Sequence, residues 1–166
     1  MKICVRDAFA SDCYRKEYSF VLDNTQISDF PDGAKTDAVN VSAEISAIDG
    51  KVSCAMIISA NFKIICSRCA LEFTLPFRSS TVKLIKQHDD GTFEDAIYVD
   101  GGYCFDIAQE ARAQIYFEFP AKPLCRKDCK GLCPVCGCDL NAGSCSCDIK
   151  TADPRLAVLR KLIDNY

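Results

Sequence analysis

Eight of the thirteen cysteines in this chain fall into four close pairs whose spacing suits metal binding. The pairs are Cys66/Cys69, Cys125/Cys129, Cys133/Cys136 and Cys145/Cys147. A structural zinc site takes four tetrahedral ligands, and cysteine thiolates are commonly supplied as local pairs that wrap the ion. Four pairs therefore predict two sites of four thiolates, each holding one zinc ion.

The order of the pairs along the chain favours one grouping. The last two pairs stand in a C-x2-C-x8-C-x-C pattern that is compact enough to close around one ion. The first two pairs then share the second ion, which clips the C-terminal part of the chain to an upstream segment. Exchange of the two middle pairs is the rival arrangement, and the sequence leaves it open.

The stretch from 125 to 148 contains seven cysteines, so one of them has no partner. Cys138 is expected to be this bystander. In "CPVCG", Pro134 and Gly137 permit a tight turn that aims backbone N–H groups at thiolate sulfur, as zinc ribbons and rubredoxin-like turns do.

Other cysteine chemistries compete with zinc. Thioredoxin-type redox chemistry needs a CxxC that opens a helix in a βαβ unit, and neither "CSRC" nor "CPVC" has that setting. Iron–sulfur ligation also uses four thiolates, but the chain shows no electron-transfer context. Disulfides require an oxidising compartment, whereas the absence of a signal-peptide run and of a membrane span predicts a soluble cytoplasmic protein.

Four more cysteines, Cys4, Cys13, Cys54 and Cys104, stand alone in the sequence. Cys54 lies on the apolar side of an expected strand, so we expect a buried free thiol that packs as a small hydrophobic residue. The sequence indicates no partner for the other three.

Strict alternation of apolar and polar residues predicts the sheet that must position these ligands. Strands are expected at 38–48 and 51–65, joined by a tight turn at Asp49-Gly50, and a third follows "CSRC" up to about 86. The alternation changes phase near Ser79-Ser80, which predicts a bulge there, and Pro76 indicates that the third strand is an edge strand or is interrupted at this residue. A weaker strand around 18–22 is expected to join this meander.

Helical spacing predicts a helix at about 105–117, and "DPRLAVLRKLI" predicts a terminal helix that starts at Asp153-Pro154. Between 88 and 104 we expect mostly loop with a short strand at 96–99. The chain is thus predicted to be α+β, with an antiparallel meander sheet or partial barrel in residues 1–120. Residues 121–166 form a cysteine-rich zinc module and terminal helix packed on the first part.

The sequence contains few candidate catalytic residues. His88 is the sole histidine, and it is expected to be a solvent-exposed loop residue. No Ser-His-Asp arrangement, phosphate-binding glycine loop or metal-hydrolase motif is present. The acidic residues near 89–95 are expected to be solvated. We therefore expect a protein that is not an enzyme and has no small-molecule substrate, with a redox-active CxxC protein or an RNA-processing enzyme as the alternative.

The C-terminal two thirds of the chain resemble the YceD-like family, the large ribosomal RNA subunit accumulation proteins. The resemblance covers "CSRCALEF", the "FP..PLC" approach at 119–125, "CKGLCPVCG", "LN...C.C" and "DPRLAVL". It implies a role in the accumulation of 23S ribosomal RNA and in large-subunit biogenesis. Some members lack much of the cysteine module, which favours a structural role for the metal sites.

Charge narrows the expected partner, which the resemblance places among large-subunit precursor rRNA and large-subunit ribosomal proteins. The formal charge is −3, and two all-thiolate zinc sites lower it to about −7. Lys122, Arg126, Lys127 and Lys130 partly offset the thiolates. A chain of this charge is expected to hold a basic ribosomal protein at least as readily as bare RNA.

Overall fold

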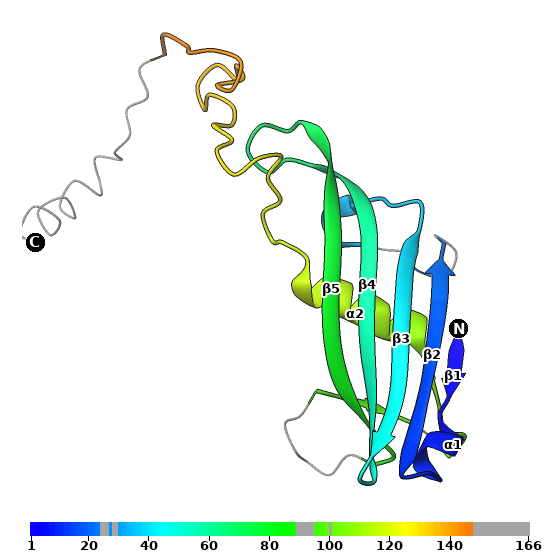
Figure 1. Ribbon diagram of the computed structural model, residues 1–166. Helices are drawn as coiled ribbons and strands as arrows, with labels where there is room; N and C mark the ends of the chain where they lie inside the picture. The colour runs from blue at the N-terminus through cyan, green and yellow to red at the C-terminus, as the bar shows by residue number, and fades with distance from the viewer. Residues whose placement is uncertain (24–26, 28–29, 89–94, 100, 148–166) are drawn as a thin grey trace, which may run out of the picture.

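The computed structural model describes residues 1–23, 27, 30–88, 95–99 and 101–147. They form a five-stranded sheet, a two-stranded sheet, the short helix α1 (Arg6–Phe9), a 3-10 turn (Pro31–Gly33) and helix α2 (Ile107–Glu118). A cysteine-rich module follows α2 and lies at one end of the larger sheet (Figure 1). The mostly antiparallel sheet with its helices confirms the α+β class.

The predicted meander is present as strands β3 (Val39–Ile48), β4 (Lys51–Ile65) and β5 (Glu72–Lys86). Asp49 and Gly50 join β3 to β4 with φ values of 51° and 73°, the left-handed conformation that a tight hairpin turn requires. The alternate residues of β3 from Val39 to Ala47 are buried, so the alternation in the sequence follows the two faces of the sheet.

Two further strands flank the meander. β2 (Cys13–Leu22) pairs antiparallel with β3, and β6 (Ala96–Tyr98) pairs in parallel with the end of β5. The strand order is β2-β3-β4-β5-β6, and β2 does not pair with β6 in the described residues. The sheet is therefore open and does not form a closed barrel in the described residues.

The bulge predicted near Ser79 and Ser80 is absent. β5 pairs with β4 without interruption from Glu72 to Ile85, so its side chains keep one phase throughout. The pattern misleads because Ser79 and Lys83 occupy buried positions, whereas Val82 is 70% exposed. Pro76 lies on the part of β5 that pairs with β4 alone, so the expected edge position is confirmed.

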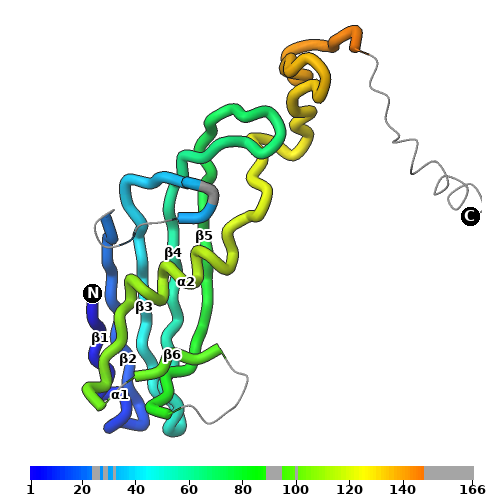
Figure 2. Tube along the Cα trace, turned by 180° about the vertical axis from the view of Figure 1, so that it is seen from behind, coloured from blue at the N-terminus to red at the C-terminus, as the bar shows by residue number. Residues whose placement is uncertain are grey.

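Helix α2 lies across one face of the sheet, here called the covered face (Figure 2). Asp106 caps its start by accepting a hydrogen bond from the Ala108 N–H at 3.0 Å. Ile107, Ala111 and Ile115 are fully buried against the sheet. The helix predicted at about 105–117 is thus confirmed, with observed bounds of Ile107–Glu118.

An ion cluster around the buried Lys83 joins β5 to α2. The Lys83 ammonium lies 3.1 Å from Asp95 and 3.5 Å from Glu110 of α2, and this pairing allows a lysine to be buried in the sheet. Cys54 lies opposite Lys83 on β4, and burial raises the pKa of its thiol to about 11. Cys54 is 1% exposed, a buried free thiol as expected.

A second, smaller sheet carries a disulfide that the sequence did not indicate. β1 (Lys2–Cys4) pairs antiparallel with β7 (Cys104–Asp106), which places Cys4 directly opposite Cys104. The two cysteines form a disulfide across 100 residues of sequence. The sequence argument against disulfides concerned the clustered cysteines, and it did not anticipate a bond between these two isolated ones. Each strand is three residues long, too short for its alternation to be recognised.

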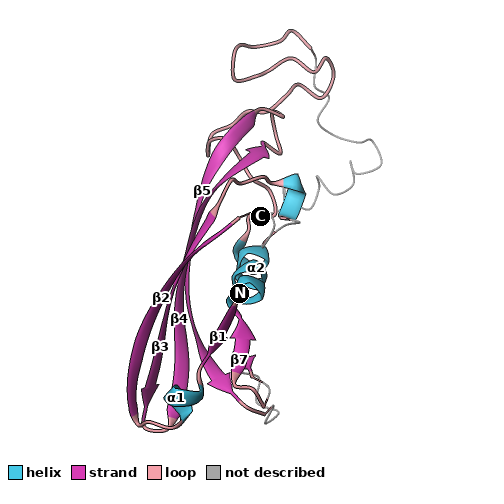
Figure 3. Cartoon of the chain, turned by 90° about the vertical axis from the view of Figure 1, so that its right-hand side faces the viewer, coloured by secondary structure: helices cyan, strands magenta, loops and turns pink. Residues whose placement is uncertain are grey.

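The opposite face of the large sheet, here called the outer face, is not covered by any described element (Figure 3). None of the helices in the described part of the chain combines the length and the apolar character that a membrane span requires. The terminal helix predicted from Asp153 lies outside the described residues. The division at residue 120 and the packing of the terminal helix remain predictions.

Candidate metal centre

The first cluster joins the turn between β4 and β5 to the segment that follows α2. It contains Cys66, Cys69, Cys125 and Cys129, whose sulfur atoms all lie within 4.8 Å of one another. The Sγ atoms of Cys66 and Cys129 are 3.8 Å apart, and those of Cys69 and Cys125 are 3.7 Å apart. A tetrahedral zinc with Zn–S bonds of about 2.3 Å places its sulfurs about 3.8 Å apart, so these thiols fit such an ion.

Backbone hydrogen bonds hold the two segments of this cluster together. The Ser67 N–H donates to the Pro123 carbonyl at 2.9 Å, and the Leu132 N–H donates to the Arg68 carbonyl at 3.1 Å. The Arg68 guanidinium donates to the Cys129 carbonyl at 2.8 Å. The "CSRC" turn therefore receives the C-terminal segment through its backbone as well as through its sulfurs.

Gly131 permits this close approach. Its φ is +78°, and a Cβ built at this position lies 2.9 Å from the Arg68 carbonyl oxygen. An L side chain is therefore disfavoured twice at residue 131, by the left-handed backbone and by contact with the turn.

The second cluster contains Cys133, Cys136, Cys145 and Cys147, again with all sulfur atoms within 4.8 Å. The "CPVC" segment makes the expected turn: the Gly137 N–H donates to the Cys133 carbonyl at 2.9 Å, and the Val135 N–H points to the Cys133 Sγ at 3.4 Å. Gly137 has a φ of 73°, which this turn needs. The structure thus groups the eight thiols in the arrangement that the chain order favoured.

Backbone N–H groups of the turns lower the pKa of one thiol in the first cluster, Cys66, and of two in the second, Cys133 and Cys136. Burial by itself raises the pKa of Cys66, but N–H groups of Cys125, Arg68 and Cys69 outweigh it and lower that pKa to about 6. N–H groups of Cys136 and Val135 lower the pKa of Cys133 to about 6. Donors aimed at sulfur favour the thiolate, which is the form that binds metals.

Other thiols in the clusters shift in the opposite direction. Burial and the neighbouring sulfurs raise the pKa of Cys125 to about 12, and the Cys136 sulfur and burial do the same for Cys147. Like charges close together prevent all four sulfurs from ionising at once. A divalent cation bound among them would supply the opposite charge.

Asn141 connects the two clusters. Its side-chain amide N–H donates to the Cys129 Sγ at 3.5 Å, and its side-chain Oδ1 accepts a hydrogen bond from the Lys130 backbone N–H at 2.8 Å. Asp139 fixes the amide by accepting its N–H at 2.8 Å. Asn141 itself lies in the loop between the cysteine pairs of the second cluster. The sequence alone gives Asn141 no role, and its place in the "LN...C.C" motif is the one feature that could have marked it as important.

The remaining polar candidates lie outside the two sets of four. Cys138 borders the second cluster, where the neighbouring Cys136 sulfur, burial and Cys145 raise its pKa to about 12. His88 is exposed, as expected. Of the acidic residues near 89–95, Asp95 pairs with Lys83, and residues 89–94 lie outside the described part of the chain.

Comparison with known proteins identifies one matching family model. The model of the family described as large ribosomal RNA subunit accumulation protein YceD matches residues 54–163, which include both clusters and the sheet strands around the first one. No curated protein and no solved structure matches the chain.

Proposed function

Because the chain belongs to the YceD family of large ribosomal RNA subunit accumulation proteins, we propose that it is a noncatalytic factor that supports 23S rRNA accumulation and large-subunit assembly in the cytoplasm. The family match supports this role. The two four-cysteine clusters support a structural rather than a chemical use of the C-terminal module.

Each cluster holds one zinc ion in this proposal. The ligands are Cys66, Cys69, Cys125 and Cys129 at the first site and Cys133, Cys136, Cys145 and Cys147 at the second. Four thiolates fill a tetrahedral site, whereas catalytic zinc keeps a position for water or substrate. Zinc bound here would stabilise the fold, and the chain's own turns and N–H groups would orient the sulfurs.

The spacing of the sulfurs is the single observation that carries the metal assignment. Two sulfur–sulfur separations in the first cluster, 3.7 and 3.8 Å, match the edge of a zinc–thiolate tetrahedron. The redox alternative has less support, because "CSRC" lies between two strands and "CPVC" lies in a turn. Thioredoxin-type thiols are activated at a helix N-terminus, which neither segment provides.

The partner in this proposal is a basic large-subunit ribosomal protein, with precursor rRNA as the rival. The formal charge of −3 falls to about −7 with two zinc–thiolate sites, and such a charge attracts a basic protein and repels phosphate. Binding of purified protein to large-subunit proteins and to 23S rRNA transcripts at physiological salt distinguishes the two.

The ratio of 23S to 16S rRNA in cells that carry Cys129→Ser tests the function and its dependence on the first site. Cys129 is buried in the first cluster, whereas Cys13 is exposed and lies outside both, so Cys13→Ser is the matched control. We expect Cys129→Ser to lower the ratio toward that of cells lacking the gene, and Cys13→Ser to leave it unchanged. A normal ratio in cells lacking the gene would overturn the proposed function.

A further inference from the structure

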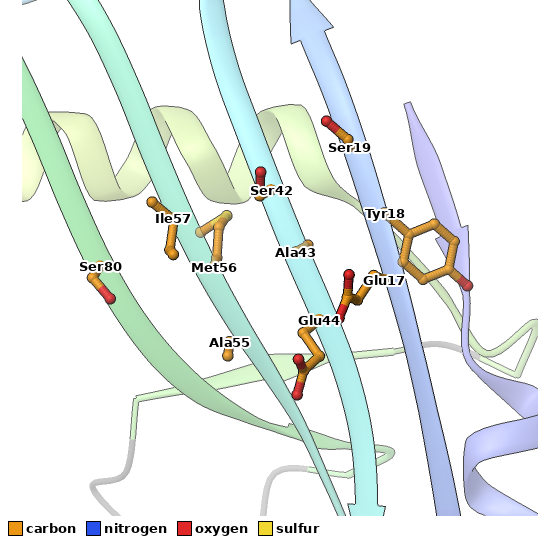
Figure 4. A pocket seen from close by; sticks show the side chains of 10 residues that line it. All are labelled: Glu17, Tyr18, Ser19, Ser42, Ala43, Glu44, Ala55, Met56, Ile57 and Ser80. Atoms are coloured by element: carbon orange, nitrogen blue, oxygen red, sulfur yellow. The ribbon is translucent and has the colours of Figure 1, made fainter.

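The outer face of the large sheet contains a hollow that crosses strands β2 to β5 (Figure 4). The ladders place residues side by side in rows: Ser19, Ser42, Ile57 and Ser80 form one row, and Glu17, Glu44, Ala55 and Val82 form the next. The small side chains of Ser42 and Ala55 in the middle of these rows leave a hollow of about 440 Å³.

The end of the hollow at β2 and β3 is acidic. Glu17 and Glu44 are directly opposite each other on neighbouring strands, so both carboxylates face the same side. Arg15 pairs with Glu44 at 2.6 Å. Within the described residues Glu17 has no ion-pair or hydrogen-bond partner, so one carboxylate in this pair is left without a counter-charge.

The floor and the far end of the hollow are apolar or hydroxylated. Ile57 is 42% exposed and Val82, in the next row, is 70% exposed. Ser80 brings a hydroxyl to the end at β5, and Arg78 follows one row beyond it. Three strand spacings separate β2 from β5, about 14 Å, a span suited to a short peptide segment.

We propose that this hollow is the docking surface for a lysine- or arginine-bearing segment of a protein partner. A long basic side chain combines an aliphatic stem, which suits Ile57 and Ala55, with a cationic head that can reach Glu17. Arg78 lies one row beyond the hollow on β5, where its charge disfavours a second cation. The inference rests on the proposed function only for the class of partner, a basic large-subunit ribosomal protein.

Charge reversal within the hollow tests this assignment. Purified full-length protein is titrated against each purified large-subunit ribosomal protein and against a 23S rRNA transcript at physiological salt. Glu17→Lys removes the free carboxylate, and Ser42→Arg places a competing guanidinium in the hollow. Glu72→Lys is the matched control, since Glu72 is exposed on the same face but lies opposite Ile65, outside the hollow.

We expect the ribosomal protein that binds the unmodified chain to bind Glu17→Lys and Ser42→Arg at least tenfold more weakly, with Glu72→Lys within twofold. Unchanged binding by the two hollow variants overturns the inference and leaves the proposed function standing. Tighter transcript binding by both hollow variants, without loss of protein binding, assigns the face to RNA and also overturns it. If the unmodified chain binds no large-subunit protein, the protein partner of the proposed function fails together with this inference.

Discussion

Besides lying close to the other three thiols of its cluster, Cys129 accepts hydrogen bonds from two other residues. Its Sγ accepts a hydrogen bond from Asn141, and its carbonyl accepts one from the Arg68 guanidinium. These partners come from two different segments, the loop of the second cluster and the β4–β5 turn. Groups that hydrogen-bond to a metal ligand orient that ligand and influence how tightly the metal is held.

Replacement of Asn141 tests the hydrogen bond to the Cys129 sulfur. We expect Asn141→Ala to lower the affinity of the first site for zinc by about 10-fold to 100-fold, because the Cys129 sulfur loses a donor and the loop loses its anchor to Lys130. Competition with a chromophoric chelator measures the affinity. Asn61→Ala, on the outer face, is the control and should leave it unchanged. Equal affinities in both variants would show that the amide has no role at the site.

Replacement of Gly131 tests the close approach of the two segments at the first cluster. Gly131→Ala introduces a Cβ 2.9 Å from the Arg68 oxygen at a φ of +78°. The left-handed backbone alone costs an alanine about 1–2 kcal/mol, and the contact adds to this. Gly50→Ala has a similar φ with no atom within 4 Å, so it isolates the backbone term. Thermal unfolding should show the larger loss for Gly131→Ala, and equal losses would contradict the contact.

At the scale of elements, the sheet was predictable where apolar residues mark one face. β3 and β4 alternate so regularly that their bounds and turn follow from the sequence, and α2 follows from its helical spacing. β5 was harder, because Ser79 and Lys83 lie on its covered face and Val82 lies on its outer face. The partner of a buried lysine comes from another element, so sequence alternation gives no sign of it.

The ion cluster between β5 and α2 gives a prediction for packing. Lys83→Met removes the charge and leaves Glu110 without its cation beside the core, so we expect a loss of about 2–4 kcal/mol in the free energy of unfolding. Adding Glu110→Gln should recover part of that loss. Lys51→Met is the control, because Lys51 is exposed on the outer face. Denaturant unfolding of the unmodified chain, Lys83→Met, Glu110→Gln and the double variant measures the coupling between the two residues, and additive effects would contradict the ion pair.

The disulfide between β1 and β7 gives a second prediction at this scale. It closes a loop across 100 residues of sequence. Disulfides typically add about 2–4 kcal/mol to the free energy of unfolding. A phosphine reductant should therefore lower the unfolding temperature of the native chain. The Cys4→Ser/Cys104→Ser variant should start at the lower value and ignore the reductant. A native chain whose unfolding temperature does not respond to reductant would contradict the bond.

At the scale of the whole molecule, the sequence indicated which cysteines share a cluster, but it did not indicate how the chain brings distant cysteines into contact. The spacing of the last two pairs predicted their association, because at most eight residues separate consecutive cysteines of the set. The first cluster required the β4–β5 turn to lie beside the segment after α2, which depends on the path of α2 across the covered face. Arg68, Gly131 and Asn141 join these parts, and their roles become visible only when both segments are in place.

The clusters lie apart from the apolar core, which is formed by the sheet, α1 and α2. The large sheet thus has its own packing, and the module at its end depends on the eight thiols and a few hydrogen bonds. If both clusters bind zinc, as proposed, the metal holds the cysteine-rich module while the sheet relies on its own apolar core.

The metal content of protein purified without chelator or reductant tests the central claim most directly. The account predicts two zinc ions per chain by elemental analysis, and one in the Cys129→Ser variant, because the second cluster does not use that residue. A chain that contains no metal, with its eight cluster thiols free or oxidised, would contradict the account.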